Sequence, residues 1–164
     1  MSTNSADLDP SIANFLIIPA DEIRYDNLPI AIVSKLAIQK MDPFIATSAL
    51  GELAQRDPQE TKEAAERILE EPLWDPHITA FALTLLYDRD PDSAIQRMTK
   101  LVSTCEVPKV LEAMVESILS DSERFLVAPA DQLARAIARR VAAAVPGRFS
   151  DVEQRGRFLK LFGE

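Results

Sequence analysis

The stretch "DPFIATSALGELAQRDP" (42–58) decides the fold, because it recurs at a spacing of 33 as "DPHITAFALTLLYDRDP" (75–91). Nine of the 17 aligned positions are identical: both Asp-Pro pairs, Ile45/Ile78, Ala49/Ala82, Leu50/Leu83, Leu53/Leu86 and Arg56/Arg89. Self-similarity at a period of this length is typical of arrays of stacked supersecondary units.

The repeat fades toward both ends of the chain. "DPSIA" (9–13) matches "DPFIA" (42–46) at four of five positions, and "VPKVLEAMVESIL" (107–119) keeps the apolar rhythm at a spacing of 32 but lacks the aspartate. Terminal units of such arrays are commonly atypical because they cap the stack.

Each unit predicts two helices. Asp42 is a suitable N-cap, Pro43 fits the first helical position, and the apolar residues that follow at helical spacing form one stripe. Asp57 and Pro58 repeat this logic, and Glu60 completes a capping-box pattern. We expect a turn of two to four residues between the helices, because each proline blocks continuation of the helix before it. The predicted inner faces are Ile45, Ala49, Leu50 and Leu53, then Ala64, Ala65, Ile68 and Leu69, then Ile78, Ala82, Leu83 and Leu86, then Ala94, Ile95, Met98, Leu101 and Val102.

The composition agrees with an all-α fold in one domain. The 164 residues are 47% hydrophobic and 27% charged, with only 4 glycines, which favours helices over a β-sandwich or barrel. We expect seven or eight helices in antiparallel hairpins. Residues 28–145 form the stacked hairpins, 1–27 a strap or degenerate cap interrupted by Pro10 and Pro19, and 146–164 a C-terminal capping helix.

The segment "DPHITAFALTLLYDRDPDSAIQRMTKL" (75–101) resembles HEAT-like repeats of the short bacterial type, which also occur in phycobilin lyases. The resemblance implies a curved α-α superhelix, or solenoid, with a protein-binding surface and no catalytic residues. The positions that carry it are Asp75, Pro76, Ile78, Ala82, Leu83, Leu86, Asp90, Pro91, Ala94 and Ile95.

The charge of the chain indicates the kind of partner. The net charge is −8, but residues 1–132 carry −12 and residues 133–164 carry +4. An acidic chain repels nucleic acid and anionic membrane, so we expect a basic protein partner. The N-terminal segment 1–22 holds no basic stretch, and the apolar run 15–18 is too short for a signal core or a span, so we expect a cytoplasmic, soluble protein.

Catalytic and metal chemistry has little support in the sequence. The single cysteine, Cys105, and the single histidine, His77, allow neither a disulfide nor a cysteine or multi-histidine metal site. No phosphate loop or dinucleotide motif is present. We therefore expect no enzyme activity, no metal and no cofactor, and interpret Cys105 as a small packing residue.

Two neighbouring stretches supply the candidate partner-binding residues. "QETKEAAERILEE" (59–71) presents Glu63, Glu66 and Glu70, either as an acidic binding face or as a solvated face paired internally, Lys62 with Glu66 and Glu63 with Arg67. "EEPLWDPHITAF" (70–81) adds Trp74 and His77. One interpretation is that these two residues contact a partner, because exposed aromatic residues are enriched at interfaces. The other is that the stretch only links two repeats and Trp74 covers the edge of a hairpin.

The stretch "DQLARAIARRVAAAVPGRF" (131–149) predicts a basic amphipathic helix that closes the stack. Leu133, Ile137 and Val141 face inward, whereas Arg135, Arg139 and Arg140 face outward. A membrane or RNA role is the alternative for this helix.

The leading functional expectation is a non-catalytic protein-binding scaffold. A narrower alternative is an immunity protein that neutralises a toxin, for example a nuclease, through charge complementarity. Two further classes stay open. One is an enzyme or small-ligand protein that uses the Trp74 and His77 region. The other is a structural module that associates through its basic end and acidic middle. For the oligomeric state we expect a monomer or a weak homo-oligomer.

Overall fold

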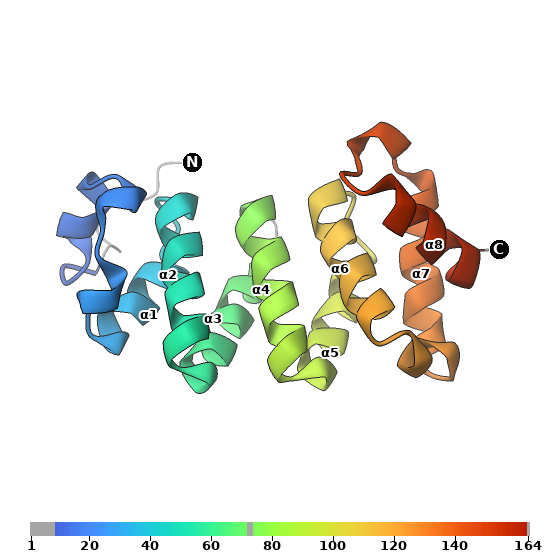
Figure 1. Ribbon diagram of the computed structural model, residues 1–164, viewed down its shortest axis with the longest axis horizontal. Helices are drawn as coiled ribbons and strands as arrows, with labels where there is room; N and C mark the ends of the chain where they lie inside the picture. Colours follow the sequence, from blue (N-terminus) through green and yellow to red (C-terminus); the bar gives the residue numbers. More distant parts are fainter. Residues whose placement is uncertain (1–8, 72–73, 164) are drawn as a thin grey trace.

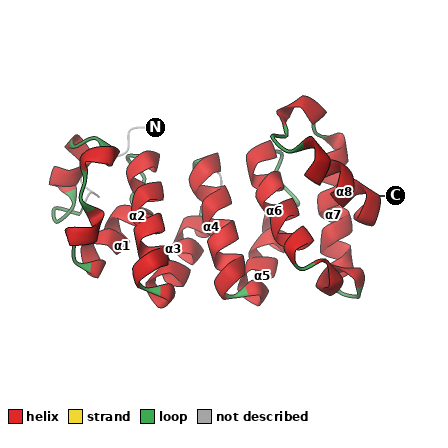
Figure 2. Ribbon diagram, viewed as in Figure 1, coloured by secondary structure: helices red, strands yellow, loops and turns green. Residues whose placement is uncertain are grey.

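The computed structural model describes residues 9–71 and 74–163. Over these ranges the chain forms eight α-helices and several short 3-10 helices, with no β-strand, which confirms the all-α prediction (Figure 2). The α-helices are α1 (Ile30–Ile38), α2 (Pro43–Arg56), α3 (Pro58–Glu70), α4 (Pro76–Arg89), α5 (Pro91–Leu101), α6 (Pro108–Ser120), α7 (Ala130–Ala143) and α8 (Val152–Phe162).

The helices lie in two rows (Figure 1). In that view α2, α4, α6 and α8 form the nearer row, and α1, α3, α5 and α7 lie behind them. Packing is mainly between sequential neighbours, such as α1 with α2, α3 with α4 and α4 with α5, and α4 also packs against α2 and α6 in its own row. The chain therefore advances from the N-terminal 3-10 helices at one end to α7 and α8 at the other.

Aspartate and proline start the repeated helices, as the sequence predicts. Asp42 Oδ1 accepts hydrogen bonds from the backbone N–H groups of Phe44 and Ile45 at 2.9 and 3.2 Å. Asp75 caps α4 in the same way, with distances of 2.9 and 3.0 Å to two N–H groups. Helices α2 to α6 each begin at a proline, whose missing N–H costs nothing in the first turn.

The turn between the two helices of a unit is shorter than predicted. Only Asp57 separates α2 from α3, and only Asp90 separates α4 from α5. Each aspartate donates its own N–H to the helix before it, Asp57 to Leu53 O at 2.8 Å and Asp90 to Leu86 O at 2.7 Å. Its side chain caps the helix after it. One extended residue thus ends one helix and begins the next, so the expected two to four residues are not needed.

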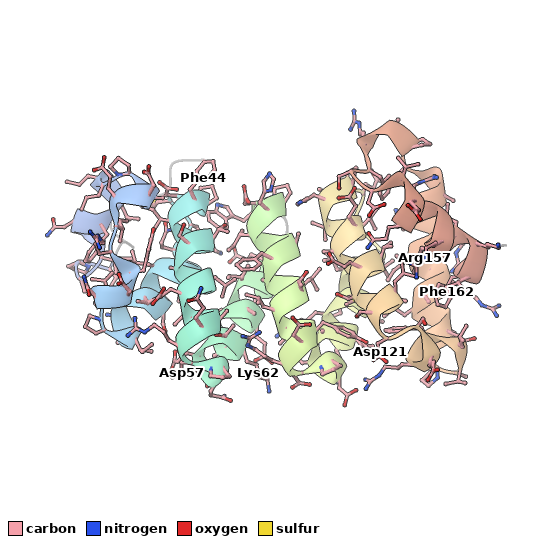
Figure 3. The ribbon with its side chains drawn as sticks, in the orientation of Figure 1. Phe44, Asp57, Lys62, Asp121, Arg157 and Phe162 are labelled. Atoms are coloured by element: carbon pink, nitrogen blue, oxygen red, sulfur yellow. The ribbon has the colours of Figure 1, made fainter. Side chains whose placement is uncertain are left out.

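Three side-chain pairings considered for α3 are not found among the described residues. Glu63 accepts a hydrogen bond from Gln59 Nε2 and does not pair with Arg67. Glu60 does not complete a capping box, because its Oε2 accepts a hydrogen bond from Ser34 Oγ of α1 at 2.8 Å. Lys62 pairs with Asp90 at 2.9 Å rather than with Glu66. In Figure 3 Lys62 lies at the same edge of the molecule as Asp57, where the first helix of a unit ends and the second begins. For Glu60 and Lys62, contacts to neighbouring units therefore replace contacts within the helix.

The arginine at the end of the first helix also joins neighbouring units. Arg56 Nη1 donates to the carbonyl oxygens of Leu28 and Tyr25 at 2.9 and 3.2 Å. Arg89, its equivalent in the next unit, donates from Nη2 to Ala54 O at 3.0 Å. The identity of these two residues in the repeat thus has a structural cause, because each closes a helix end of the unit before it.

The predicted apolar stripes form a continuous core. All of the residues named for α2, α3 and α4 are buried, and Cys105 is buried as predicted. In α5 the residues Ala94, Met98 and Leu101 are buried, as is Val102 just after the helix. Ile95 is only half-buried, because it lines an open groove between α5 and α7.

The two ends of the chain depart from the repeat. Residues 1–8 of the predicted N-terminal segment lie outside the described residues, and the rest forms three short 3-10 helices, η2 (Ala13–Ile17), η3 (Ala20–Glu22) and η4 (Tyr25–Asn27). The predicted basic helix ends at Ala143, short of 149, and Pro146 begins the 3-10 helix η6 (Pro146–Arg148). The C-terminal helix α8 follows. No helix within the described ranges has the length and apolar character needed to cross a membrane.

Three side chains of α7 face inward as predicted, and its three arginines differ in how exposed they are. Leu133, Ile137 and Val141 are buried. Arg135 and Arg139 are exposed, whereas Arg140 is half-buried. Arg140 forms an ion pair with Glu106, with 3.6 Å between Nη1 and Oε1. Arg140 therefore fixes the loop before α6 to α7.

Candidate functional site

A groove of about 550 Å³ runs across the row formed by α2, α4, α6 and the start of α8. Thr47 comes from α2, and residues 150–154 close the groove on the side of α8. The central part is lined from α4 by His77, Ala80, Phe81 and Thr84, and from α6 by Lys109, Glu112, Ala113 and Glu116.

The groove is lined by equivalent positions of successive units. The four lining residues of α4 and the four of α6 match one to one at a spacing of 32: His77 with Lys109, Ala80 with Glu112, Phe81 with Ala113 and Thr84 with Glu116. Thr47 in turn precedes Ala80 at a spacing of 33. Positions that repeat with the helices share one face, so the groove is a product of the repeat and not of an irregular loop.

The middle of the groove is apolar. Phe81 is half-buried and packs against the core. Ala80 of α4 and Ala113 of α6 are buried. The hydroxyl groups of Thr47 and Thr84 donate to carbonyl oxygens of their own helices, at 2.8 and 3.2 Å. The hydroxyl hydrogens of these threonines are therefore already used, and their methyl groups remain for apolar contact with a ligand.

Two of the three carboxylates in the groove hold the fold together. Glu112 Oε2 accepts a hydrogen bond from Ser150 Oγ at 2.8 Å, and its other oxygen accepts one from the Ser150 N–H. Asp151 caps α8 by accepting from the Gln154 N–H at 2.8 Å. Together they fasten the start of α8 to α6.

Three charged or titratable side chains of the groove are available to a ligand. Glu116, Lys109 and His77 are exposed, and none of the three side chains has a hydrogen-bond or ion-pair partner among the described residues. With three carboxylates against one lysine, the groove carries a negative charge overall. A basic side chain would be favoured there over an acidic one.

The five residues predicted to bind a partner do not share one site. Glu63, Glu66 and Glu70 lie on α3, which belongs to the other row of helices (Figure 1). Glu66 accepts a hydrogen bond from Ser93 Oγ at 2.9 Å, and Glu63 accepts one from Gln59 Nε2 at 2.9 Å. Trp74 is half-buried against the core in the link before α4, and His77 alone lines the groove.

A second, larger groove of about 630 Å³ lies between α5 and α7. It is mostly apolar and contains none of the five residues predicted to bind a partner. Its charged pair, Arg124 and Asp92, is already joined at 3.1 Å. The groove over α4 and α6 is the better candidate, because it combines an apolar centre with charged groups that lack partners.

Within the described residues, no group of three or more His, Cys, Asp or Glu side chains is placed to hold a metal ion. Comparison of the chain with protein-family models, curated proteins and solved structures found no match. The fold and the geometry of the groove therefore carry the functional argument.

Proposed function

We propose that the chain is a HEAT-like α-solenoid that binds a basic segment of a partner protein in the groove over α4 and α6. The observation that carries this proposal is the recurrence of the groove-lining positions at a spacing of 32. Repeat scaffolds characteristically present equivalent positions of successive units along one binding surface.

The proposed ligand is an extended or helical segment with one Lys or Arg beside an apolar residue. The apolar residue contacts Phe81, the largest apolar side chain among the residues that line the groove. The cation lies beside Glu116, which is exposed and has no partner among the described residues. Charge complementarity of this kind sets specificity and association rate more than it sets affinity.

Selection from a random peptide display library, with the whole protein as target, tests the proposal. We expect enrichment of peptides with Lys or Arg next to an apolar residue. Glu116→Lys should weaken the selected peptides by about tenfold or more, equivalent to about 1.4 kcal/mol. Glu63→Lys is the matched control, because it makes the same charge change on α3.

The result has two informative alternatives. Loss of binding in Glu63→Lys but not in Glu116→Lys would move the site to the acidic face of α3. Selected peptides without basic residues would contradict the proposed ligand. Far-ultraviolet circular dichroism of both variants separates loss of binding from loss of fold.

A further inference from the structure

The end of the molecule formed by α7 and α8 carries basic side chains without partners. Arg135 and Arg139, one turn apart on α7, line a groove of about 270 Å³ together with Leu159 and Phe162 of α8. Arg157 and Lys160 are exposed on α8, and Figure 3 shows Arg157 and Phe162 at this end. None of these four cations forms an ion pair within the described part of the chain.

The opposite end is acidic. Asp21 and Glu22 of η3 and Asp26 of η4 are exposed, and none of them has an ion-pair partner among residues 9–71 and 74–163. The neighbouring Ile17 is 84% exposed, and Ile18 is 36% exposed. An acidic surface with an uncovered aliphatic patch thus stands at the start of the stack.

The two ends are complementary in both charge and apolar character. Leu161 at the basic end is 49% exposed, which gives that end an aliphatic contact of its own. The two ends lie at opposite extremes of the molecule (Figure 1), so they cannot meet within one chain. End layers of stacked repeats are usually covered by polar capping faces, and here the exposed aliphatics leave that cover incomplete.

We propose that these ends join copies of the chain head to tail, the acidic face of η3 and η4 in one copy against α7 and α8 of the next. The contact is heterologous, because two different surfaces meet. Such contacts produce open rows or rings instead of closed two-fold dimers. The inference is independent of the peptide groove, which lies over α4 and α6 and stays open in the row.

Sedimentation of the whole protein over a range of concentrations tests the proposal. At about 0.01 M salt, where the screening length is about 30 Å, the average mass should rise with concentration. It should exceed the 18.2 kDa of one chain. At about 1 M salt, where the screening length is about 3 Å, the mass should fall back to that of the monomer.

A change of charge at each end makes the test specific. Arg135→Glu with Arg139→Glu cancels the charge of the basic end, because the two new carboxylates balance Arg157 and Lys160. Asp21→Lys with Glu22→Lys reverses the charge of the acidic end, where Asp26 alone stays acidic among the three named residues. Each double variant alone should stay monomeric at low salt. An equimolar mixture of the two should associate in pairs, because the unaltered acidic end of the first variant meets the unaltered basic end of the second.

Arg97→Glu with Lys100→Glu is the control. It makes the same charge change on α5, away from the ends, and should associate like the unaltered protein. An unaltered protein that stays monomeric at low salt overturns the proposal, as does association that the end variants do not change. Binding of poly-glutamate to a purely monomeric protein would assign the basic end to a different acidic partner, which also overturns it.

Discussion

Tyr87 near the end of α4 donates its hydroxyl hydrogen to Asp121 Oδ2, 2.8 Å away at the end of α6. The same carboxylate oxygen forms an ion pair with Arg124, whose Nε lies 3.1 Å away. The Tyr87 ring is buried and stacks on Phe125, with ring centroids 6.4 Å apart. One tyrosine therefore joins the best-preserved repeat to the unit in which the repeat fades.

Tyr87→Phe should reduce the free energy of unfolding by about 1.5 to 3 kcal/mol, the range for a hydrogen bond to a charged group. The ring contact with Phe125 is kept, so the loss belongs to the hydroxyl group. Urea unfolding measures it. In a double-mutant cycle with Asp121→Asn the two effects should fall short of additivity; full additivity would mean that the hydrogen bond contributes nothing.

Alkaline pH should destabilise the protein through the same residue. Burial of the ring, and then the hydrogen bond to Asp121, raise the pKa of Tyr87. A group whose folded pKa is raised contributes its stability below the unfolded pKa, about 10 for tyrosine, and loses it as the pH rises further. The phenolate absorbance should therefore appear at higher pH in the folded protein than in urea. Tyr87→Phe should remove the part of this difference that belongs to Tyr87 and leave the part that belongs to Tyr25, whose pKa is also raised by burial.

Asp57→Ala should cost about 1 kcal/mol, as the loss of an N-cap does. The Asp57 carboxylate accepts from the N–H groups of Gln59 and Glu60 at 3.1 and 3.0 Å. Asn caps nearly as well as Asp, so Asp57→Asn should restore most of the stability. Thermal unfolding of both variants provides the measurement. Equal losses of stability in Asp57→Ala and Asp57→Asn would show that the charge of Asp57 stabilises the protein and that its capping hydrogen bonds do not.

Acid should weaken the contact between α3 and α5. The hydrogen bond and charge of Lys62 lower the pKa of Asp90 from its ordinary value of 3.8. A depressed folded pKa contributes stability above the unfolded pKa, and this stability is lost as the pH falls through the folded value. Lys62→Met should therefore flatten the fall in unfolding free energy below about pH 4. Lys100→Met, which removes an exposed lysine near the end of α5, should leave that slope unchanged.

The helix starts could be predicted from the sequence because their causes are local. Asp42 accepts from the N–H groups two and three positions further on. Pro43 fits beside it because it has no N–H of its own to satisfy in the first turn, and the pair is visible in the sequence. The contacts of Lys62 could not be read in the same way. The helical spacing favours Glu66, but its partner Asp90 belongs to the next unit and stands at the start of a helix that only the packing brings near.

Unusual local composition does not indicate the groove. Trp74 and His77 stand out in the sequence, yet only His77 lines the groove. The residues that complete it are ordinary members of α6. The repeat could have identified them, since Lys109 and Glu116 follow His77 and Thr84 at a spacing of 32. What the spacing could not supply is the attachment of α8, which depends on Ser150.

Cys105 should resist thiol reagents as long as the protein is folded. The side chain is fully buried between α5 and α6, and burial raises the pKa of its thiol. Because the thiolate is the reactive form, both effects reduce the rate of attack. Ellman's reagent should therefore modify Cys105 at the rate of unfolding in native buffer and at once in denaturant. Rapid modification in native buffer, in a protein whose circular dichroism is unchanged, would show that the loop after α5 opens without unfolding the stack.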